Sequence, residues 1–315
     1  GGSAEAAGGD AGSPLMQELA AVYDGPVERD ASLADKSNFR LGGSADWLFT
    51  PTRAAQLGPL LAWLAEQRLP VTVLGEGSNV LVRDGGIRGA VIRITRALES
   101  LDFVGDAARC GAGLASARLS RRALAEGRGG FVWAAALPGN LGGALAMNAG
   151  CFGGELADHF VSAEGFAATG APVTLTRDQL DFGYRRSGLP AGVVVTSLVL
   201  NLPVMDAPAR AEADARFKDI IAARSASQPA GLGTAGSTFK NPPGDHAGRL
   251  IDACGLKGLR VGGARISERH ANFIVTETGR TRAADVEALM REVAEIVAAK
   301  TGVVLEPEVR IYGEP

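Results

Sequence analysis

A serine lies between a glycine and a threonine in the stretch TAGSTFKNP, which spans residues 234–242, and a lysine follows it three positions later. Small hydroxyl residues beside glycine are common in turns, so Ser237 could be an ordinary loop residue. A glycine-flanked serine is also typical of serine hydrolases, but this stretch is not G-x-S-x-G and follows no clear strand-to-helix elbow. Whether Ser237 takes part in chemistry therefore depends on what the rest of the chain can bind.

Two glycine-rich loops could hold a phosphate-containing cofactor. The loop GEGSN at residues 75–79 offers consecutive backbone N–H groups and two polar side chains, which suit a pyrophosphate, although a β-turn is an equally good reading. It lacks the G-x-G-x-x-G spacing of a Rossmann fold and is followed by a strand pattern. The second loop, ALPGNLGGALAMNAG at residues 136–150, could approach a ring system closely.

The second loop belongs to a segment without charged residues, at residues 129–154. Such a segment is long enough to suggest a membrane span. Pro138, two asparagines and many glycines argue against one, because they would leave backbone groups unpaired in lipid. A buried surface shaped against a flat cofactor is the better interpretation.

The hydrophobic pattern predicts the elements that must position these loops. Apolar residues at helical spacing predict a helix over 54–67, and a buried strand follows at 70–75. Two strand-like runs joined by a turn at 84–86 fill residues 80–94, and a strand, a glycine turn and a helix are expected over 109–127. Strands are predicted within 160–202, helices over 208–225, 248–256 and 284–302, and a last strand over 303–312. In that strand Glu306, Glu308 and Arg310 share the polar face.

Length and composition exclude several classes of function. A chain of 315 residues is expected to form two or three domains. A net charge of -3 gives no electrostatic case for binding nucleic acid or an anionic membrane. Three scattered cysteines predict no disulfide framework and favour a reducing compartment. Three scattered histidines predict no metal site. His270 is interpreted as structural. Residues 1–14 read as a disordered tail.

Several motifs, taken together and in order from about residue 36 to residue 313, resemble the UDP-N-acetylenolpyruvoylglucosamine reductase family in its compact subtype. They are FRLGGSADW (39–47), LGEGSNVLVRDGG (74–86), ALPGNLGGALAMNAG (136–150), FGYRRSGL (182–189), GSTFKNP (236–242), AGRLIDACGLKGLRVGGARISERHANFIV (247–275) and LEPEVRIYG (305–313). The resemblance implies an α+β fold with two FAD-binding lobes of the vanillyl-alcohol-oxidase (PCMH) type at 15–97 and 98–207. A substrate-binding domain at 208–302 follows, and a final strand at 303–315 returns to the first lobe.

The resemblance also implies a reaction. NADPH reduces a noncovalently bound FAD and departs, and the flavin then delivers hydride to the enolpyruvyl C3 of UDP-N-acetylglucosamine enolpyruvate, which gives UDP-N-acetylmuramate. By the family pattern Ser237 donates a proton to C2, while Arg185 and Glu308 stabilise the enolate. Arginine suits this role because its planar fork can bind a carboxylate through two hydrogen bonds. Arg185 could otherwise form a surface salt bridge, and Glu308 could be an exposed carboxylate of the strand face, for which Glu306 is an alternative.

The same resemblance implies the FAD site. The residues expected to bind FAD are Gly75, Glu76, Gly77, Ser78, Asn79, Val80, Leu81, Pro138, Gly139, Asn140, Gly142, Gly143, Asn148, Ala149 and Gly150. An anionic nucleotide sugar requires a locally cationic lobe, so the candidates for its diphosphate and uracil, each of which could equally be a solvated charge, are Arg224, Lys240, Asn241, Arg249 and Lys257. Tyr184 is a further candidate for substrate contact. The chain departs from the family pattern at Cys151-Phe152, where Ala-Tyr is commoner, and at Asn140, where threonine is usual. A bacterial, cytoplasmic monomer is expected.

Two other functions fit part of the sequence. An FAD oxidoreductase of the same fold that acts on an alcohol or a sugar lactone would explain the first half of the chain but neither GSTFKNP nor LEPEVR. A nucleotide-sugar binding protein without catalysis would have no use for Ser237, Arg185 and Glu308 beside a flavin site. The reductase is therefore the preferred hypothesis.

Overall fold

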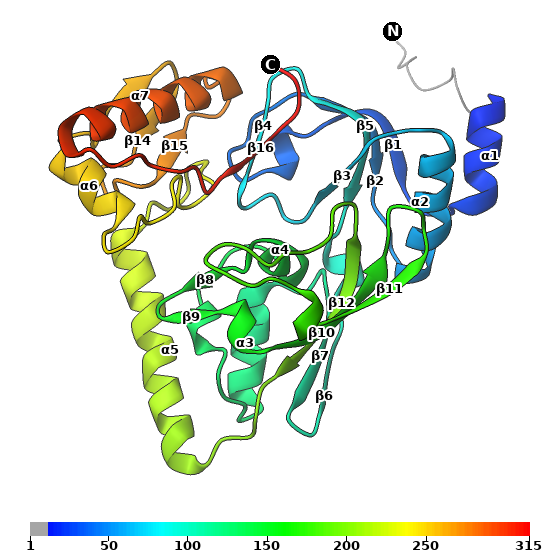
Figure 1. The fold of residues 1–315 in the computed structure, drawn as a ribbon, viewed down its shortest axis with the longest axis horizontal. Helices are drawn as coiled ribbons and strands as arrows, with labels where there is room; N and C mark the ends of the chain where they lie inside the picture. Colours follow the sequence, from blue (N-terminus) through cyan, green and yellow to red (C-terminus); the bar gives the residue numbers. More distant parts are fainter. Residues whose placement is uncertain (1–11) are drawn as a thin grey trace, which may run out of the picture.

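The computed structural model describes residues 12–315. Its first lobe is a four-stranded sheet covered by helices (Figure 1). The strand order is β1 (Val27–Ser32), β2 (Ser44–Phe49), β5 (Ile87–Arg93) and β3 (Val71–Leu74), and β5 runs parallel to both neighbours. Helix α2 (Leu57–Glu66) buries its leucines at helical spacing, which confirms the helix predicted over 54–67. Strand β3 confirms the strand predicted at 70–75.

Helix α1 (Pro14–Val22) packs beside α2 and has no counterpart among the sequence predictions. Ser13 caps it by accepting a hydrogen bond from the backbone of Met16, and Pro14 opens its first turn. Residues 1–11, which make up most of the tail predicted at 1–14, lie outside the described residues.

The second lobe is a five-stranded antiparallel sheet. Its order is β11 (Pro172–Thr176), β10 (Phe160–Phe166), β12 (Val194–Asn201), β7 (Ala107–Gly111) and β6 (Leu101–Val104). Strand β7 leads into α3 (Ser116–Ala125), which confirms the pattern predicted over 109–127. The uncharged segment forms the short buried helices η4 (Val132–Ala134) and α4 (Leu141–Met147) and then the hairpin of β8 (Gly150–Cys151) and β9 (Gly154–Glu155). Within residues 12–315, no helix has the length and apolar character needed to cross a membrane.

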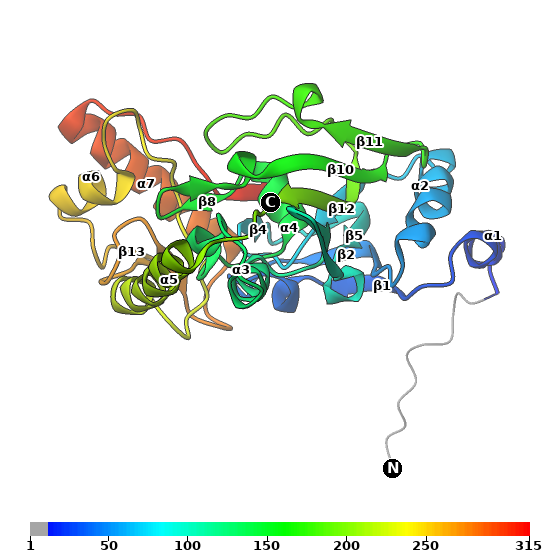
Figure 2. The same ribbon diagram turned by 90° about the horizontal axis from the view of Figure 1, so that it is seen from below.

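Helix α5 (Ala207–Ser227) connects the second lobe to the C-terminal lobe and confirms the helix predicted over 208–225. It runs along the outside of the second lobe beside α3 (Figures 1 and 2). The C-terminal lobe combines α6 (Ala247–Ala253) and α7 (Ala283–Thr301) with a small sheet of β13 (Arg260–Val261), β14 (Ala264–Ile266) and β15 (Ile274–Thr276). Both helices confirm predicted ones.

The last predicted strand is shorter in the structure than the sequence suggests. Only β16 (Arg310–Tyr312) is a strand, and it pairs in parallel with β4 (Val80–Val82), so the chain does return to the first lobe. The prediction of a strand from residue 303 is wrong, because before β16 the segment forms only an isolated bridge, between Pro307 and Phe239, and no continuous ladder. Burial still alternates there, since Leu305 and Val309 are buried and Glu306 is exposed.

Buried apolar side chains join the lobes unequally. One cluster extends from the first lobe into the second and includes Trp47 and Leu198. A second fills the C-terminal lobe and takes in Phe39, Leu41 and Leu81 of the first lobe. The first lobe therefore shares a core with each of the other two.

Candidate active site

A cleft lies where the three lobes meet, and each lobe supplies part of its wall. The first lobe contributes residues 73–80, the second lobe contributes residues 137–140, 143–144, 146–147, 149–152 and Arg185, and helix α5 contributes Arg224 and Gln228. The C-terminal part of the chain contributes residues 235–237, Phe273, Glu308, Arg310 and Tyr312. Segments far apart in the sequence thus meet at one site, and Ser237, Arg185 and Glu308 are all among its lining residues.

The two glycine-rich loops face each other across this cleft. Gly77 has a φ of +71°, and a Cβ on it would lie 2.2 Å from the carbonyl oxygen of Lys36. Gly139 has a φ of +88°, and its Cβ would lie 2.6 Å from the Ser78 hydroxyl oxygen. Glycine is required at both positions, because any side chain would strain the backbone and displace a neighbour. The two loops can therefore approach each other closely in the cleft wall.

The first loop has the hydrogen-bonding capacity that a pyrophosphate requires. No backbone N–H from Gly75 to Asn79 donates a hydrogen bond to another group in the described part of the chain. Consecutive free N–H groups in a turn form an anion-binding concavity without needing a net positive charge. The loop is fixed from behind, since the Gly77 carbonyl accepts from the Asn38 N–H at 2.9 Å. These residues fit the diphosphate of FAD.

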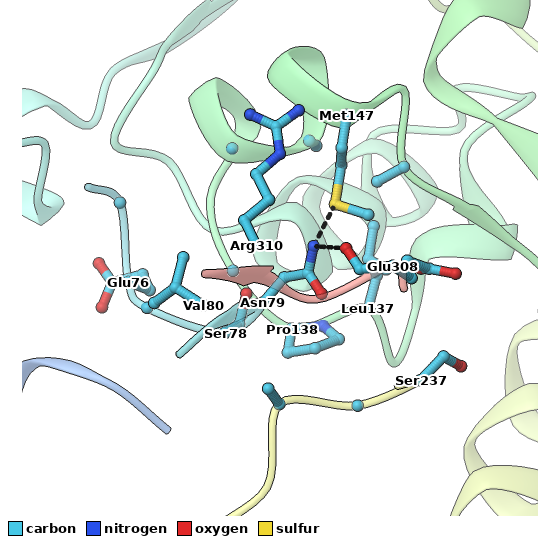
Figure 3. A pocket seen from close by; sticks show the side chains of 18 of the residues that line it. Glu76, Ser78, Asn79, Val80, Leu137, Pro138, Met147, Ser237, Glu308 and Arg310 are labelled. Carbon is cyan, nitrogen blue, oxygen red and sulfur yellow. Dashed lines mark hydrogen bonds between the residues drawn. The ribbon is translucent and has the colours of Figure 1, made fainter. Parts of the chain in front are cut away.

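Asn140 and Asn79 hold the cleft wall together. Asn140 is buried, its side-chain amide donates to the Ile94 carbonyl at 2.9 Å, and its carbonyl accepts from the Gly143 N–H at 3.1 Å. The Asn79 amide donates to the backbone carbonyl of Glu308 at 3.2 Å and contacts the Met147 sulfur at 3.4 Å (Figure 3). The first loop is thereby tied to the segment that carries Glu308.

Arg185 and Glu308 form an ion pair inside the cleft. The Arg185 Nε donates to Glu308 Oε1 at 3.0 Å, and the Arg185 Nη2 donates to the Gly150 carbonyl at 2.8 Å. The side chains are only 16% and 9% exposed. Burial raises the pKa of the Glu308 carboxyl above its usual value, although the positive charges of Arg185 and Lys240 oppose this shift. The site thus holds a carboxyl group that keeps its proton to higher pH than an exposed glutamate.

Ser237 lies on a segment that forms backbone hydrogen bonds with a neighbouring segment on each side. Its neighbour Thr238 donates its N–H to the Asn272 carbonyl at 2.8 Å and accepts from the Glu308 N–H at 2.8 Å. Figure 3 shows Ser237 on this segment, beside the one that carries Glu308. Gly236 adopts a φ of +73°, which directs the chain into this hydrogen-bonded segment. Within residues 12–315 no group forms a hydrogen bond with the Ser237 hydroxyl, which leaves it available to a ligand.

Two other groups in the cleft wall are polar and partly buried. Burial lowers the pKa of the Arg224 guanidinium, and no carboxylate of the described residues forms an ion pair with it. Burial also raises the pKa of the Cys151 thiol to about 11, against the opposing effects of Arg185 and Arg224. Its thiol donates to the Trp133 carbonyl at 3.2 Å. Cys151 is therefore a neutral wall residue rather than a nucleophile.

The predicted FAD residues fall into two groups. Residues 75–80, Pro138, Gly139, Asn140, Gly143, Ala149 and Gly150 line the cleft, while Gly142 lines an adjoining one. Leu81 and Asn148 do not line it. Leu81 belongs to a hydrophobic core, and the Asn148 side chain binds the Gly183 carbonyl and the Ala157 N–H at 2.9 Å each. These two residues lie behind the wall and support it.

Most of the predicted substrate residues do not line the cleft. Lys240 lies outside the cleft wall and pairs with Glu306 at 2.7 Å, so Glu306 is placed apart from Glu308. The Asn241 N–H donates to the Tyr184 hydroxyl at 2.9 Å. Arg249 and Lys257 do not line the cleft and pair with carboxylates of their own lobe, Asp245 and Asp252. His270 does not line it either, and its ring packs against Phe273 at 4.5 Å.

Several cleft residues have no role among the sequence predictions, and three of them, Arg310, Gln228 and Phe152, show which signals were missing. Arg310 lines both cavities, and its side chain donates to the Ala146 carbonyl at 2.9 Å. Gln228 follows α5, and Phe152 lies at the tip of the β8–β9 hairpin. Arg310 could have been found, because it alternates with Glu308 on the polar face of the last segment. The other two depend on how α5 and the hairpin pack.

Comparisons with known proteins agree with this geometry. Residues 45–176 match the family model of an FAD binding domain, and residues 228–312 match that of the UDP-N-acetylenolpyruvoylglucosamine reductase C-terminal domain. The chain is 44% identical over 302 residues to the UDP-N-acetylenolpyruvoylglucosamine reductase of Alkalilimnicola ehrlichii, covering 95% of this chain and 99% of that one. It is 42% identical over 300 residues to that of Geobacter metallireducens, covering 95% and 98%.

A solved structure is similar as well. The crystal structure of UDP-N-acetylenolpyruvylglucosamine reductase from Thermus caldophilus superposes with a TM-score of 0.79 and 38% identity, over 92% of this chain and 100% of that one. The likeness covers all three lobes. The expected α+β class, with an FAD-binding module followed by a C-terminal domain, is thereby confirmed.

Proposed function

Because the chain belongs to the family of UDP-N-acetylenolpyruvoylglucosamine reductases, which are FAD-dependent oxidoreductases, we propose that it uses NADPH to reduce UDP-N-acetylglucosamine enolpyruvate to UDP-N-acetylmuramate. One observation carries the proposal: Ser237, Arg185 and Glu308, which are far apart in the sequence, line one cleft together with both glycine-rich loops. Held by residues 75–80, Pro138, Gly139 and Gly150, bound FAD would supply the two-electron hydride chemistry that links NADPH to C3 of the enolpyruvyl group. The flavin is proposed to be held noncovalently.

The residues of the cleft supply what this reduction requires. Addition of hydride to C3 places negative charge on C2 and on the carboxylate beside it. Arg185 stabilises that charge, since the free part of its guanidinium can bind the carboxylate while Nε stays on Glu308. Glu308, whose pKa is raised by burial, can hold a proton beside the enolate oxygen. Ser237 donates the proton to C2, which completes the addition of one hydride and one proton across the double bond.

The remaining polar groups are proposed to bind the nucleotide-sugar. Arg224 faces the cleft without a carboxylate partner among the described residues, so it is the best-placed cation for the diphosphate. Tyr184, Lys240 and Asn241 lie nearby, outside the wall. Arg249 and Lys257 would have to leave their ion pairs to contribute. A role in peptidoglycan precursor synthesis, in the cytoplasm of a bacterium and as a monomer, belongs to the same proposal.

An anaerobic redox cycle tests the function. The purified protein should be yellow, NADPH should bleach the flavin absorbance, and the enolpyruvyl sugar should restore it with formation of UDP-N-acetylmuramate. Acid precipitation should release the flavin into the supernatant. Bleaching followed by reoxidation with an alcohol-derived or lactone substrate but not with the enolpyruvyl sugar would favour the other FAD oxidoreductase. A protein that binds the sugar but no flavin would contradict the proposal.

A further inference from the structure

The hairpin of β8 and β9 turns through an unfavourable backbone conformation. Gly150 pairs with Glu155 and Cys151 with Gly154, which leaves Phe152 and Gly153 as a two-residue turn. Both turn residues have positive φ, +48° for Phe152 and +81° for Gly153. Such a turn normally carries asparagine, aspartate or glycine at its first position, because a bulky side chain rarely adopts positive φ. Something outside the hairpin must hold this conformation.

Arg216 on helix α5 makes the contact that can do so. Its Nη2 donates to the Phe152 carbonyl at 2.6 Å, and the same atom lies 3.8 Å from the position that a Cβ on Gly153 would take. Arg216, Ile220 and Arg224 follow one another at four-residue spacing, so they share one face of α5. Ile220 is buried and Arg224 lines the cleft. This face therefore holds the turn of the hairpin at one end and reaches the cleft at the other.

The opposite end of the hairpin holds Arg185. The Gly150 carbonyl accepts a hydrogen bond from the Arg185 Nη2 at 2.8 Å, and the Arg185 Nε binds Glu308. The guanidinium also lies over the Tyr184 ring, with Cζ 4.9 Å from the ring centroid. Its position thus depends on that ring and on two hydrogen-bond acceptors, and one of the acceptors belongs to the hairpin.

We propose that Arg216 is a positioning residue, which fixes the β8–β9 hairpin and, through the Gly150 carbonyl, sets the orientation of the Arg185 guanidinium. The inference rests on the proposed function, since Arg185 matters only if it meets the substrate carboxylate. Arg216 itself does not line the cleft or contact the groups that react, and it reaches the wall only from behind, through the Phe152 carbonyl. Displacing a catalytic group by about 1 Å from a distance can slow a reaction by up to a hundredfold.

Two variants test the proposal on the full-length protein loaded with FAD. Arg216→Ala should slow reoxidation of the flavin by the enolpyruvyl sugar roughly tenfold, while reduction by NADPH stays close to normal. Amide hydrogen exchange should become faster at residues 151–154. Arg210→Ala is the matched control, because Arg210 lies on the same helix and also donates from Nη2 to a backbone carbonyl, that of Ala125, at 3.1 Å. The control should change neither measurement.

The variant Phe152→Gly distinguishes the effect of the hydrogen bond from Arg216 to the hairpin from any other role of Arg216. Glycine adopts positive φ without strain, so the hairpin of Phe152→Gly should not need Arg216. In that background Arg216→Ala should change reoxidation and exchange less than it does in the natural chain. An effect of equal size in both backgrounds would overturn the proposal, as would Arg216→Ala behaving like Arg210→Ala.

The exchange measurement keeps this inference separate from the proposed function. If the natural protein is not reoxidised by the enolpyruvyl sugar, the proposed function fails, and hydrogen exchange alone still shows whether Arg216 holds the hairpin. Faster exchange at 151–154 without slower reoxidation would show that the hairpin moves independently of Arg185, which would also overturn the inference.

Discussion

The C-terminal lobe is joined to the first lobe and to the second lobe in different ways. Its junction with the first lobe contains a buried apolar cluster that includes Phe39, Leu41 and Leu81, and strand β16 pairs with β4 across it. Arg83 and Glu287 form an ion pair at 2.9 Å in the same junction. This junction resembles the interior of a single domain.

The junction with the second lobe is polar and passes across the cleft. Apart from those of the connecting helix α5, its contacts include the Arg185–Glu308 ion pair, the hydrogen bond from Asn241 to Tyr184, and the hydrogen bond from Arg310 to the Ala146 carbonyl. Within residues 12–315 no buried apolar cluster connects these two lobes. A ligand with a carboxylate and phosphates can replace such contacts, whereas it cannot replace a core. We therefore expect changes at the first junction to alter stability and changes at the second to alter catalysis.

Ser237→Ala should have the largest effect of all the variants, and it should lower the rate of catalysis without lowering stability. A general acid commonly contributes about 10²- to 10⁴-fold, so stopped-flow reoxidation by the enolpyruvyl sugar should slow by about that factor. Reduction of the flavin by NADPH should remain nearly intact, because hydride transfer between two rings needs no such proton donor. Incorporation of solvent deuterium at C2 of the product should slow in parallel. The fold should persist, since the hydroxyl makes no hydrogen bond within the described residues. Equal loss in both half-reactions would instead indicate a damaged flavin site.

Leu81→Ala, at the junction between the C-terminal lobe and the first lobe, should have a comparably large effect, but on stability rather than on catalysis. Leu81 lies on β4 and is fully buried in the cluster shared with the C-terminal lobe, and removing such a side chain typically costs about 2–5 kcal/mol. Urea denaturation of the protein should show this loss in the free energy of unfolding. Val304→Ala is the control, because that valine is 82% exposed and its truncation should change stability by less than about 0.5 kcal/mol. A folded Leu81→Ala protein with normal stability would remove the distinction between the two junctions.

Arg185→Lys should lower turnover by more than about tenfold, or about 1.4 kcal/mol of transition-state stabilisation. A lysine cannot hold Glu308, the Gly150 carbonyl and a substrate carboxylate with one planar group. Stability should change little, as the polar junction contributes little to the core. The control is Arg186→Lys, because Arg186 is 62% exposed and pairs with Asp181. Steady-state kinetics with both substrates measures the loss, and near-normal turnover would place Arg185 outside the reaction.

Local patterns predicted most of the fold. Helices α2 and α7 were predictable because their apolar residues recur at helical spacing and bury one face. The length of the last strand was not, since a strand needs a partner along its whole length and this segment finds one before β16 only at the Phe239–Pro307 bridge. Its alternating pattern survives as alternating burial. Helix α1 escaped prediction because it is short and buries a single residue, Leu19.

The site was predictable in its loops but not in its contacts. Residues 75–80 line the cleft, and a glycine-rich motif specifies their backbone conformation directly. Whether a side chain such as Asn148 or Leu81 faces the cleft depends on how that backbone is buried, and both prove to lie behind the wall. The pairing of Arg185 with Glu308 joins residues 123 positions apart, and only tertiary packing brings them together.

The smallest predicted effects compare one polar contact from each junction. Asp84 accepts hydrogen bonds from the N–H groups of Ala283 and Ala284 at 2.9 and 3.0 Å, so its charge satisfies the first turn of α7 from another lobe. Asp84→Ala should therefore lower the free energy of unfolding by about 1 kcal/mol, as loss of a helix cap does. Tyr184→Phe removes the acceptor for Asn241, but Tyr184 is 49% exposed and water can replace its hydroxyl. The loss should then stay below about 0.5 kcal/mol in the same urea titration. If the two variants prove equally destabilising, the polar junction is a fixed part of the fold, and its contacts are not the replaceable ones that substrate binding requires.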